Sequence, residues 1–392
     1  MLNRRGTPAL PAARVARNRW SDLESALPEG WTPELSSQLI SVAASDLEQA
    51  QQAAARSGAD VLVFADADHD VDDGVIAALS WWQHVCDYAV SVAPGTDNTD
   101  DWLATYQRES EQLNRAGYEA FRGAAAGVLA VPRALFDAAG GLEVTAGVEW
   151  QIDLAYRLAQ RGAVFVLAPD VAVERPAATA HISTLTESIP LLPERRSDWR
   201  RAHDVPTLHV VVDCKSAPDA AAATIAGVLD GEYRDLSITV VGWADGNPPW
   251  DDPRVQLLGA ATASFPSPFR LEVPAGCLFE PFSIRRMLNR MRESQVGLYQ
   301  ALVEPNTDEV GRSFAVRLLR TAAVERSRRL LDDDNLDDII DELFGSLWVD
   351  GQRFGIRHHA DVEGIDDRDP DKDADDADDA EDSDADDEFD ED

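Results

Sequence analysis

The sequence predicts an α/β protein in which a mixed, mostly parallel sheet is flanked by helices. Short, continuous apolar runs such as VLVFA at 61–65 are typical of strands that are buried on both faces. Segments of helical periodicity separate these runs. The alternation of strand and helix signals restarts after a Pro- and Arg-bearing connector at 187–204. We therefore expect the 392 residues to form two α/β units.

The first unit is expected over residues 31–190, after a partly ordered arm at 1–30. Residues 31–57 are predicted to be largely helical, with Asp46 as a cap and Gly58 as a stop, and LISVAAS is the one plausible strand there. Strands are predicted next at 61–65, 88–93, 127–131 and 164–169. Helices are predicted between them at 74–87, 100–116, 133–139 and 148–162.

The second unit is expected over residues 205–308. Strands are predicted at 208–213, 236–243, 255–258 and 270–273, and helices at 217–229 and 279–294. The first strand, helix and second strand suggest a parallel, right-handed unit. Residues 309–356 are predicted to form a C-terminal helical segment.

The formal net charge of -37 is unevenly distributed. Residues 361–392 are rich in Asp and Glu, and Arg368 and Lys372 are their only Arg and Lys residues. We expect this segment to be a disordered acidic tail that acts as a solubility brush or an interaction tail. The remaining body is still acidic, and no basic stripe with interleaved aromatic residues is present. A nucleic-acid role is therefore rejected, and binding to an anionic membrane is disfavoured.

Cysteine usage and the N-terminal sequence bear on the compartment. Cys86, Cys214 and Cys277 are few and far apart, which argues against a disulfide scaffold and against a thiolate metal site. The first 20 residues lack an apolar signal-peptide core, and no run approaches the ~20 apolar residues of a spanning helix. We expect no transmembrane segment and a cytoplasmic location.

An acidic cluster follows the first buried strand. Carboxylates occur at every second position, at Asp66, Asp68, Asp70 and Asp72. Ligands of open α/β sheets bind beyond the carboxyl ends of the strands, and oxygen ligands at this spacing suit Mg²⁺ or Mn²⁺. His69, between two of the acids, is a further ligand candidate. The alternative is a turn in which Asp is favoured for its backbone geometry alone.

Residues 51–175 resemble family 2 glycosyltransferases of the A-type nucleotide-sugar-binding fold. The resemblance is carried by a strand ending in DAD, the segment RALFDAAGGL at 133–142, and DLAYRLAQRG at 153–162. It implies that Asp66 and Asp68 are the metal and diphosphate acids. It also implies that Gly123 to Gly127 lie near the sugar and acceptor, and that Asp153 and Arg157 belong to the start of the family's acidic helix.

The sequence departs from the family pattern in two places. Trp150 and Gln151 stand where the family has Glu and Asp, and the side chain of Gln cannot accept the proton of an acceptor hydroxyl. Glu149 could substitute as the base if the helix starts differently. The family's two opening strands, which hold the nucleobase, are also missing upstream. A similar opening occurs at 208–243, and the second unit is either a degenerate copy of this fold or an unrelated α/β module.

The resemblance implies a metal-assisted transfer of a sugar from a nucleotide-diphosphate donor to a hydroxyl acceptor of a cell-envelope glycan or glycolipid. Mn²⁺ or Mg²⁺ would be the cofactor, and Glu149 or Asp153 the base. One alternative is a catalytically degenerate protein that binds a sugar nucleotide or scaffolds a partner. The other is a structural α/β protein that binds no nucleotide.

An arginine-rich segment lies at 313–331. Its cations could pair with acids of the same chain, or they could capture a diphosphate or an anionic polymer. The residues are Arg317, Arg320, Arg326, Arg328 and Arg329.

Overall fold

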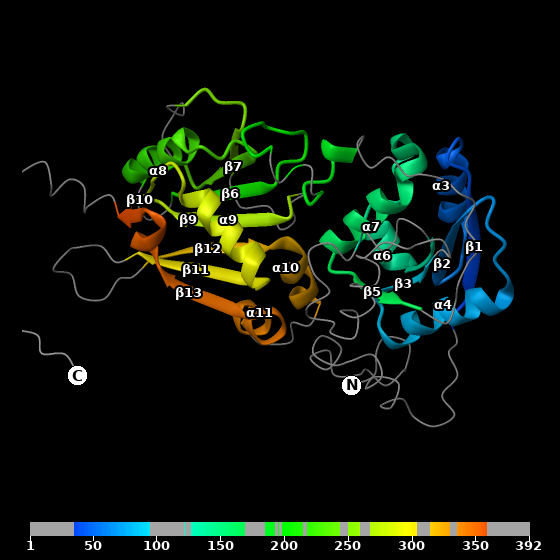
Figure 1. The fold of residues 1–392 in the computed structure, drawn as a ribbon. Coiled ribbons are helices and arrows are strands. Elements are labelled where there is room, and N and C mark those ends of the chain that lie inside the picture. The colour runs from blue at the N-terminus through cyan, green and yellow to red at the C-terminus, as the bar shows by residue number, and fades with distance from the viewer. Residues whose placement is uncertain are drawn as a thin grey trace, which may run out of the picture.

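The chain has a mixed α/β fold with two sheets that lie side by side (Figure 1). The structure is a computed structural model that describes residues 35–94, 121, 127–168, 185–192, 195, 198–214, 218–243, 250–258, 267–303, 314–329 and 335–358. The predicted arm at 1–30, the helix at 100–116 and the acidic tail lie outside these residues.

The first sheet has five strands in the order β1-β2-β4-β3-β5. β4 is antiparallel to β2 and β3, and the other pairs are parallel, so the sheet is mixed as predicted. The strands are β1 (Ser37–Val42), β2 (Val61–Asp66), β3 (Ala89–Pro94), β4 (Gly127–Pro132) and β5 (Val164–Leu167).

Helices cover both faces of this sheet. Val61, Val63 and Ala65 pack with residues of α4 (Asp73–Val85) on one face. Leu62 and Phe64 point to the other face, where α3 (Leu47–Arg56), α6 (Arg133–Ala138) and α7 (Trp150–Gln160) lie. Burial on both faces explains why β2 is apolar at every position from Val61 to Ala65 instead of at alternate ones.

The second sheet has seven strands in the order β13-β11-β12-β9-β6-β7-β8. Its strands are β6 (Leu208–Asp213), β7 (Leu236–Val241), β8 (Val255–Leu258), β9 (Phe269–Pro274), β11 (Leu298–Val303), β12 (Phe314–Arg320) and β13 (Ser346–Asp350). The helices in this part are α8 (Pro218–Asp230), α9 (Ser283–Ser294), α10 (Thr321–Arg328) and α11 (Leu336–Phe344). Two short strands, β10 (Cys277–Phe279) and β14 (Ile356–His358), form a separate antiparallel pair.

The two sheets share one strand order and one register. The order β1-β2-β4-β3-β5 corresponds to β6-β9-β12-β11-β13, with the same parallel or antiparallel relation at each step. Val61 lies opposite Pro132, and Phe269 lies opposite Arg320, so each pair joins the first residue of one strand to the last of its partner. β7 and β8 extend the second sheet beyond β6. This correspondence favours a repeated fold over an unrelated module.

Two predicted helical stretches are strands. Residues 37–42 form β1, because the edge of β2 offers a parallel partner to the β-branched run that ends at Val42. The C-terminal helical expectation is wrong for residues 314–320 and 346–350, which form β12 and β13. β12 lies between β9 and β11, and a strand in the interior of a sheet lacks the alternation that separates strands from helices in a sequence.

The arginine-rich segment is used within the chain. The guanidinium of Arg326 is buried and donates to the carbonyls of Gly162 (3.2 Å) and Ala163 (2.7 Å), which joins α10 to the end of α7. The other members pair with side chains or carbonyls: Arg317 with Glu272 and Asp337, Arg320 with the carbonyl of Gln295, Arg328 with Glu325, and Arg329 with the carbonyl of Arg161. These contacts support the structural interpretation of this segment.

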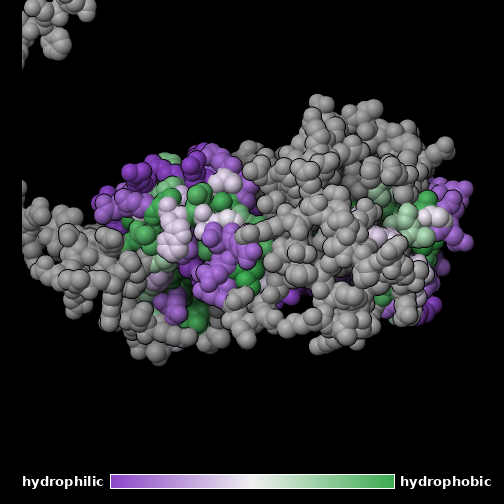
Figure 2. Space-filling view, turned by 90° about the horizontal axis from the view of Figure 1, so that it is seen from below, coloured by the Kyte–Doolittle hydropathy of each residue, from purple (hydrophilic) through white to green (hydrophobic). Residues whose placement is uncertain are grey.

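The described surface has no broad apolar face in the view of Figure 2, where hydrophobic and hydrophilic patches alternate over the coloured part of the second half. Among the described helices, none combines the length and the apolar character needed to cross a bilayer.

Candidate metal centre

Asp66 is the last residue of β2 and lies at the carboxyl end of this strand. The chain then turns, because the amide of Ala67 donates to the carbonyl of Val42 (2.9 Å) and the amide of His69 donates to the carbonyl of Asp66 (3.0 Å). The turn ends where Asp72 accepts a hydrogen bond from the amide of Val75 (2.8 Å) and caps α4. Asp72 therefore has the helix-capping role that acidic residues often have.

The turn brings Asp66, Asp68 and His69 together. Each offers one donor atom, and these atoms all lie within 4.8 Å of one another. Nδ1 of His69 is 3.9 Å from Oδ2 of Asp66. The geometry thus unites the two acids proposed as metal ligands with His69, which directly follows Asp68.

The buried side chain of His69 lacks hydrogen bonds within the described part of the chain, and this needs an explanation. Its side chain is 1 % exposed, yet neither ring nitrogen has a hydrogen-bond partner among the described residues. Buried polar atoms are nearly always hydrogen-bonded, and exceptions point to a missing ion or water. A divalent cation would satisfy one nitrogen. The donor set of two carboxylates and one imidazole fits Mn²⁺ better than Mg²⁺, which prefers oxygen alone.

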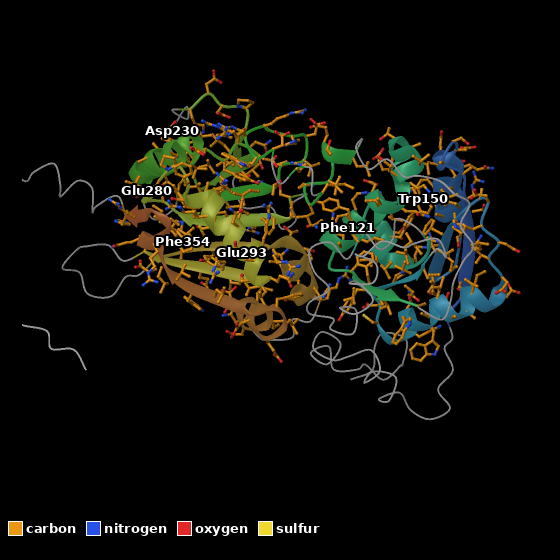
Figure 3. All side chains as sticks on the ribbon, in the orientation of Figure 1. Phe121, Trp150, Asp230, Glu280, Glu293 and Phe354 are labelled. Atoms are coloured by element: carbon orange, nitrogen blue, oxygen red, sulfur yellow. The ribbon has the colours of Figure 1, made fainter. Side chains whose placement is uncertain are left out.

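Trp150 and Gln151 hold the carboxylate of Asp66. Nε1 of Trp150 donates to Oδ1 of Asp66 (2.9 Å), and Nε2 of Gln151 donates to Oδ2 (3.4 Å) and to the carbonyl of Gly127 (3.0 Å). Trp150 is 1 % exposed and contacts Phe64 with a ring-centroid distance of 6.2 Å. Figure 3 labels Trp150 at its place in the first half. The two residues that depart from the family pattern therefore orient a predicted metal ligand.

Asp153 and Arg157 form a different set of contacts. Oδ2 of Asp153 accepts from Nε (3.0 Å) and Nη2 (2.6 Å) of Arg157. Nη1 of Arg157 donates to the carbonyls of Ala139 (2.7 Å) and Gly141 (2.6 Å). This buried pair ties α7 to the turn after α6, and none of these four hydrogen bonds runs to Asp66.

The other predicted site residues are placed as follows. Glu149 ends the 3-10 helix η2 (Val144–Glu149), directly before Trp150, and is buried at 3 % exposure. Gly127 is buried at the start of β4, and its carbonyl accepts from Gln151. Gly123 lies outside the described residues.

The cysteines are not suited to metal binding. All three are buried and free, and burial raises the pKa of Cys86 and of Cys277 to about 12 and that of Cys214 to about 11. Thiols with such a pKa stay protonated at neutral pH, whereas the thiolate is the form that binds metals.

The equivalent position in the second sheet lacks the acids. Asp66 lies opposite Val42, and Pro274 lies opposite Asp213 at the same register. The amides of Ala67 and Ala275 both donate back to the neighbouring strand. Gly276 therefore takes the place of Asp68, and His358 fills the space in front of it, since a Cβ there would lie 3.0 Å from its Nε2. Among the described residues, the acidic turn therefore follows a strand of the first sheet, and the matching turn of the second sheet lacks its carboxylates.

The sequence missed the partnership of Trp150 and Gln151 with Asp66. The signal that could have found it is their position in the first turn of α7, directly before Asp153. The sequence did indicate His69, because an imidazole is a common metal ligand and this residue lies between two acids of the turn.

Comparisons with known proteins give fold likenesses only. No family model matches the chain, and no curated protein matches it. A 2-C-methyl-D-erythritol 4-phosphate cytidylyltransferase from Thermus thermophilus is 16% identical with a TM-score of 0.26, over 37% of this chain and 89% of that one.

Two glycosyltransferase structures are also similar. TarS 1–349 of S. aureus is 9% identical with a TM-score of 0.27, over 39% of this chain and 60% of that one. The mannosyltransferase PcManGT of Pyrobaculum calidifontis, in complex with GDP-Man and Mn²⁺, is 12% identical with a TM-score of 0.27, over 40% of this chain and 61% of that one. The chain thus spans about 60% of the length of these two structures. TM-scores this low carry no argument about activity.

Proposed function

We propose that the chain is a divalent-cation-dependent glycosyltransferase that uses a nucleotide-diphosphate sugar and a hydroxyl acceptor, such as a cell-envelope glycan or glycolipid. The observation that carries the proposal is the buried imidazole of His69, which has no hydrogen-bond partner among the described residues and lies beside Asp66 and Asp68. The family motifs around these residues supply the substrate class.

Asp66, Asp68 and His69 would hold the cation, which supplies stabilisation of charge on a leaving diphosphate when it is bound. Trp150 and Gln151 fix the orientation of Asp66 by hydrogen bonds to its two oxygens. Such partners beyond the ligands tune affinity because they hold the ligand in its binding rotamer.

Glu149 is the better of the two base candidates. The carboxylate of Asp153 already accepts two hydrogen bonds from Arg157, so its Oδ2 is occupied within α7. Glu149 directly precedes the two residues that contact Asp66. Glu149→Gln should therefore lower kcat more than Asp153→Asn at equal donor affinity, and the reverse order would assign the base to Asp153.

The cation site is tested by titrating Mn²⁺ into the full chain and measuring free Mn²⁺ by electron paramagnetic resonance. His69→Leu should weaken the tightest site by about tenfold or more, because it removes a ligand. His84→Leu is the matched control, since His84 lies on α4 away from the turn. The acidic tail contributes weak sites equally to both variants. Equal affinities in the two variants would remove the cation role.

Nucleotide-sugar binding without transfer is the second candidate function. It is favoured by Gln151, an amide that lies where the family has its base and that is already bound to Asp66 and Gly127. Titrating uridine and guanosine diphosphate sugars with Mn²⁺, followed by an assay of donor hydrolysis, separates the two functions. Hydrolysis that Asp68→Ala abolishes supports the enzyme, and binding without turnover supports the second candidate.

A further inference from the structure

A group of arginines and aromatic rings lies at the second sheet, far in the sequence from the metal centre. Two guanidinium groups lie over the ring of Trp199, that of Arg200 at 4.7 Å and that of Arg285 at 4.5 Å from its centroid. The guanidinium of Arg286 lies 5.9 Å from the ring of Phe282. We call these residues and Asn289 the arginine patch.

The arginine patch surrounds a hollow. Phe282, Arg285, Arg286 and Asn289 line a volume of about 270 Å³ at the start of α9. Phe282 is 41 % exposed and forms part of the wall of this hollow.

The cations of the patch have no acidic partner in the part of the chain that the structure describes. Among the described residues, no carboxylate pairs with Arg200, Arg285 or Arg286, although the chain has a net charge of -37. Arg290, on the same helix, instead pairs with Glu293 (3.5 Å). Unpaired guanidinium groups beside one another repel, and an anion between them relieves that repulsion.

The chemistry of the patch selects carboxylates over a stacked base. The ring of Trp199 is covered by the guanidinium groups of Arg200 and Arg285, whereas the N–H edges of the three arginines have no acidic acceptor among the described residues. Guanidinium edges bind carboxylates with paired hydrogen bonds. The suitable occupant is therefore a flexible series of carboxylates.

The end of the described chain lies beside this helix. The amide of Glu280 donates to the carbonyl of Gly355 (2.9 Å), and Oγ of Ser283, the first residue of α9, donates to the same carbonyl (3.0 Å). β14 follows at once and pairs with β10. Figure 3 marks Glu280 before α9 and Glu293 near its end. Residues 359–392, which can span at most about 110 Å, therefore start near the patch.

We propose that the acidic segment 361–392 docks on the arginine patch of its own chain. The segment carries a large excess of Asp and Glu over Arg368 and Lys372, so its charge is complementary to that of the patch. Its attachment beside α9 makes the encounter intramolecular, which raises its effective concentration above that of any free acidic peptide. This docking does not depend on the sugar-transfer function.

Zero-length cross-linking tests the proposal in the full chain. Carbodiimide joins a lysine amine to a carboxylate, and the chain has only Lys215 and Lys372 as background. Arg286→Lys places a reporter in the patch and keeps its charge. Arg290→Lys is the matched control, because Arg290 is exposed on the same helix but pairs with Glu293.

We expect peptides of 361–392 to be linked to position 286 at least severalfold more than to position 290. The yield should fall between about 50 mM and 500 mM salt as the charges are screened, and it should not depend on protein concentration. The double variant Arg285→Gln, Arg286→Lys should give a lower cross-link yield at position 286 than Arg286→Lys alone. Equal links at both positions, no tail links, or a yield that rises with protein concentration would overturn the proposal.

Discussion

The indole Nε1 of Trp150 donates a 2.9 Å hydrogen bond to Oδ1 of Asp66, across 84 positions of sequence. This bond joins the first turn of α7 to the end of β2. In the glycosyltransferases that the sequence resembles, an acid stands at the position of Trp150, whereas Trp150 supplies a neutral hydrogen-bond donor. The hydrogen bond gives the carboxylate of Asp66 a fixed orientation beside Asp68 and His69.

Trp150→Phe should weaken Mn²⁺ binding without unfolding the protein. Phe keeps most of the ring packing against Phe64 but removes the donor to Asp66. Loss of such a partner lowers metal affinity by about 10-fold or more, and unfolding should become easier by only about 1 kcal/mol. Mn²⁺ titration and chemical denaturation measure the two effects. Trp243→Phe, in the second half, is the control, and equal Mn²⁺ affinity in both variants would contradict the prediction.

Gln151→Glu should make the stability of the protein depend on divalent cations. The substitution removes the amide donor to Asp66 and to the carbonyl of Gly127, and it places a carboxylate beside another carboxylate. Without metal we expect a loss of about 1–3 kcal/mol in the free energy of unfolding. A bound cation offsets the repulsion.

Thermal unfolding with and without Mn²⁺ measures this dependence. The rise in Tm on adding Mn²⁺ should be larger in Gln151→Glu than in the unchanged chain. A rise of the same size in both would show that position 151 does not face the cation.

Gly162→Ala and Arg326→Ala should both destabilise the contact between the two halves. A Cβ at residue 162 would lie 2.7 Å from the amide nitrogen of Arg326, and the φ of 82° disfavours any other residue. Arg326→Ala leaves two carbonyls without their charged donor, at a cost of about 2–4 kcal/mol.

Arg328→Ala is the control for the joint, because Arg328 forms a partly exposed pair with Glu325 that is worth about 1 kcal/mol or less. Denaturant unfolding compares the three variants. If Arg328→Ala were as destabilising as Arg326→Ala, the buried guanidinium would not be the stabilising feature.

His209 should make the protein less stable in mild acid. Burial, and then the nearby charge of Arg270, lower the pKa of His209 to about 4 from an ordinary value near 6.5. The unfolded chain binds the proton more readily, so stability should fall as pH drops from about 6.5 to about 4, by at most about 3 kcal/mol.

His209→Gln tests this, because Gln can replace the contact of Nδ1 with Oγ of Ser237 (2.8 Å) but does not titrate. The difference in unfolding free energy between the two proteins should shrink as pH falls from 7 to 4.5. A difference that stays constant over this range would contradict the assignment.

Sequence patterns predicted the parts of the fold that are set locally. Runs that are apolar or nearly so marked β2, β4, β6 and β7, because strands buried on both faces are predominantly apolar. The cap at Asp46 and the helix after it were also readable, since capping is a local hydrogen bond to Gln49. The local pattern did not reveal β12 and β13. β12 is a strand because it pairs with β9 and β11 on its two sides, and β13 because it pairs with β11 at the edge of the sheet.

By itself, the sequence determined the mixed α/β fold class, the acidic turn after β2 and the charge of the tail, because composition, spacing and period are properties of short segments. Only the tertiary structure decided which groups meet: that Trp150 and Gln151 hold Asp66, that Arg157 takes the carboxylate of Asp153, and that His69 is buried without a partner among the described residues. Contacts of this kind join residues brought together by strand order and register, which no local pattern specifies.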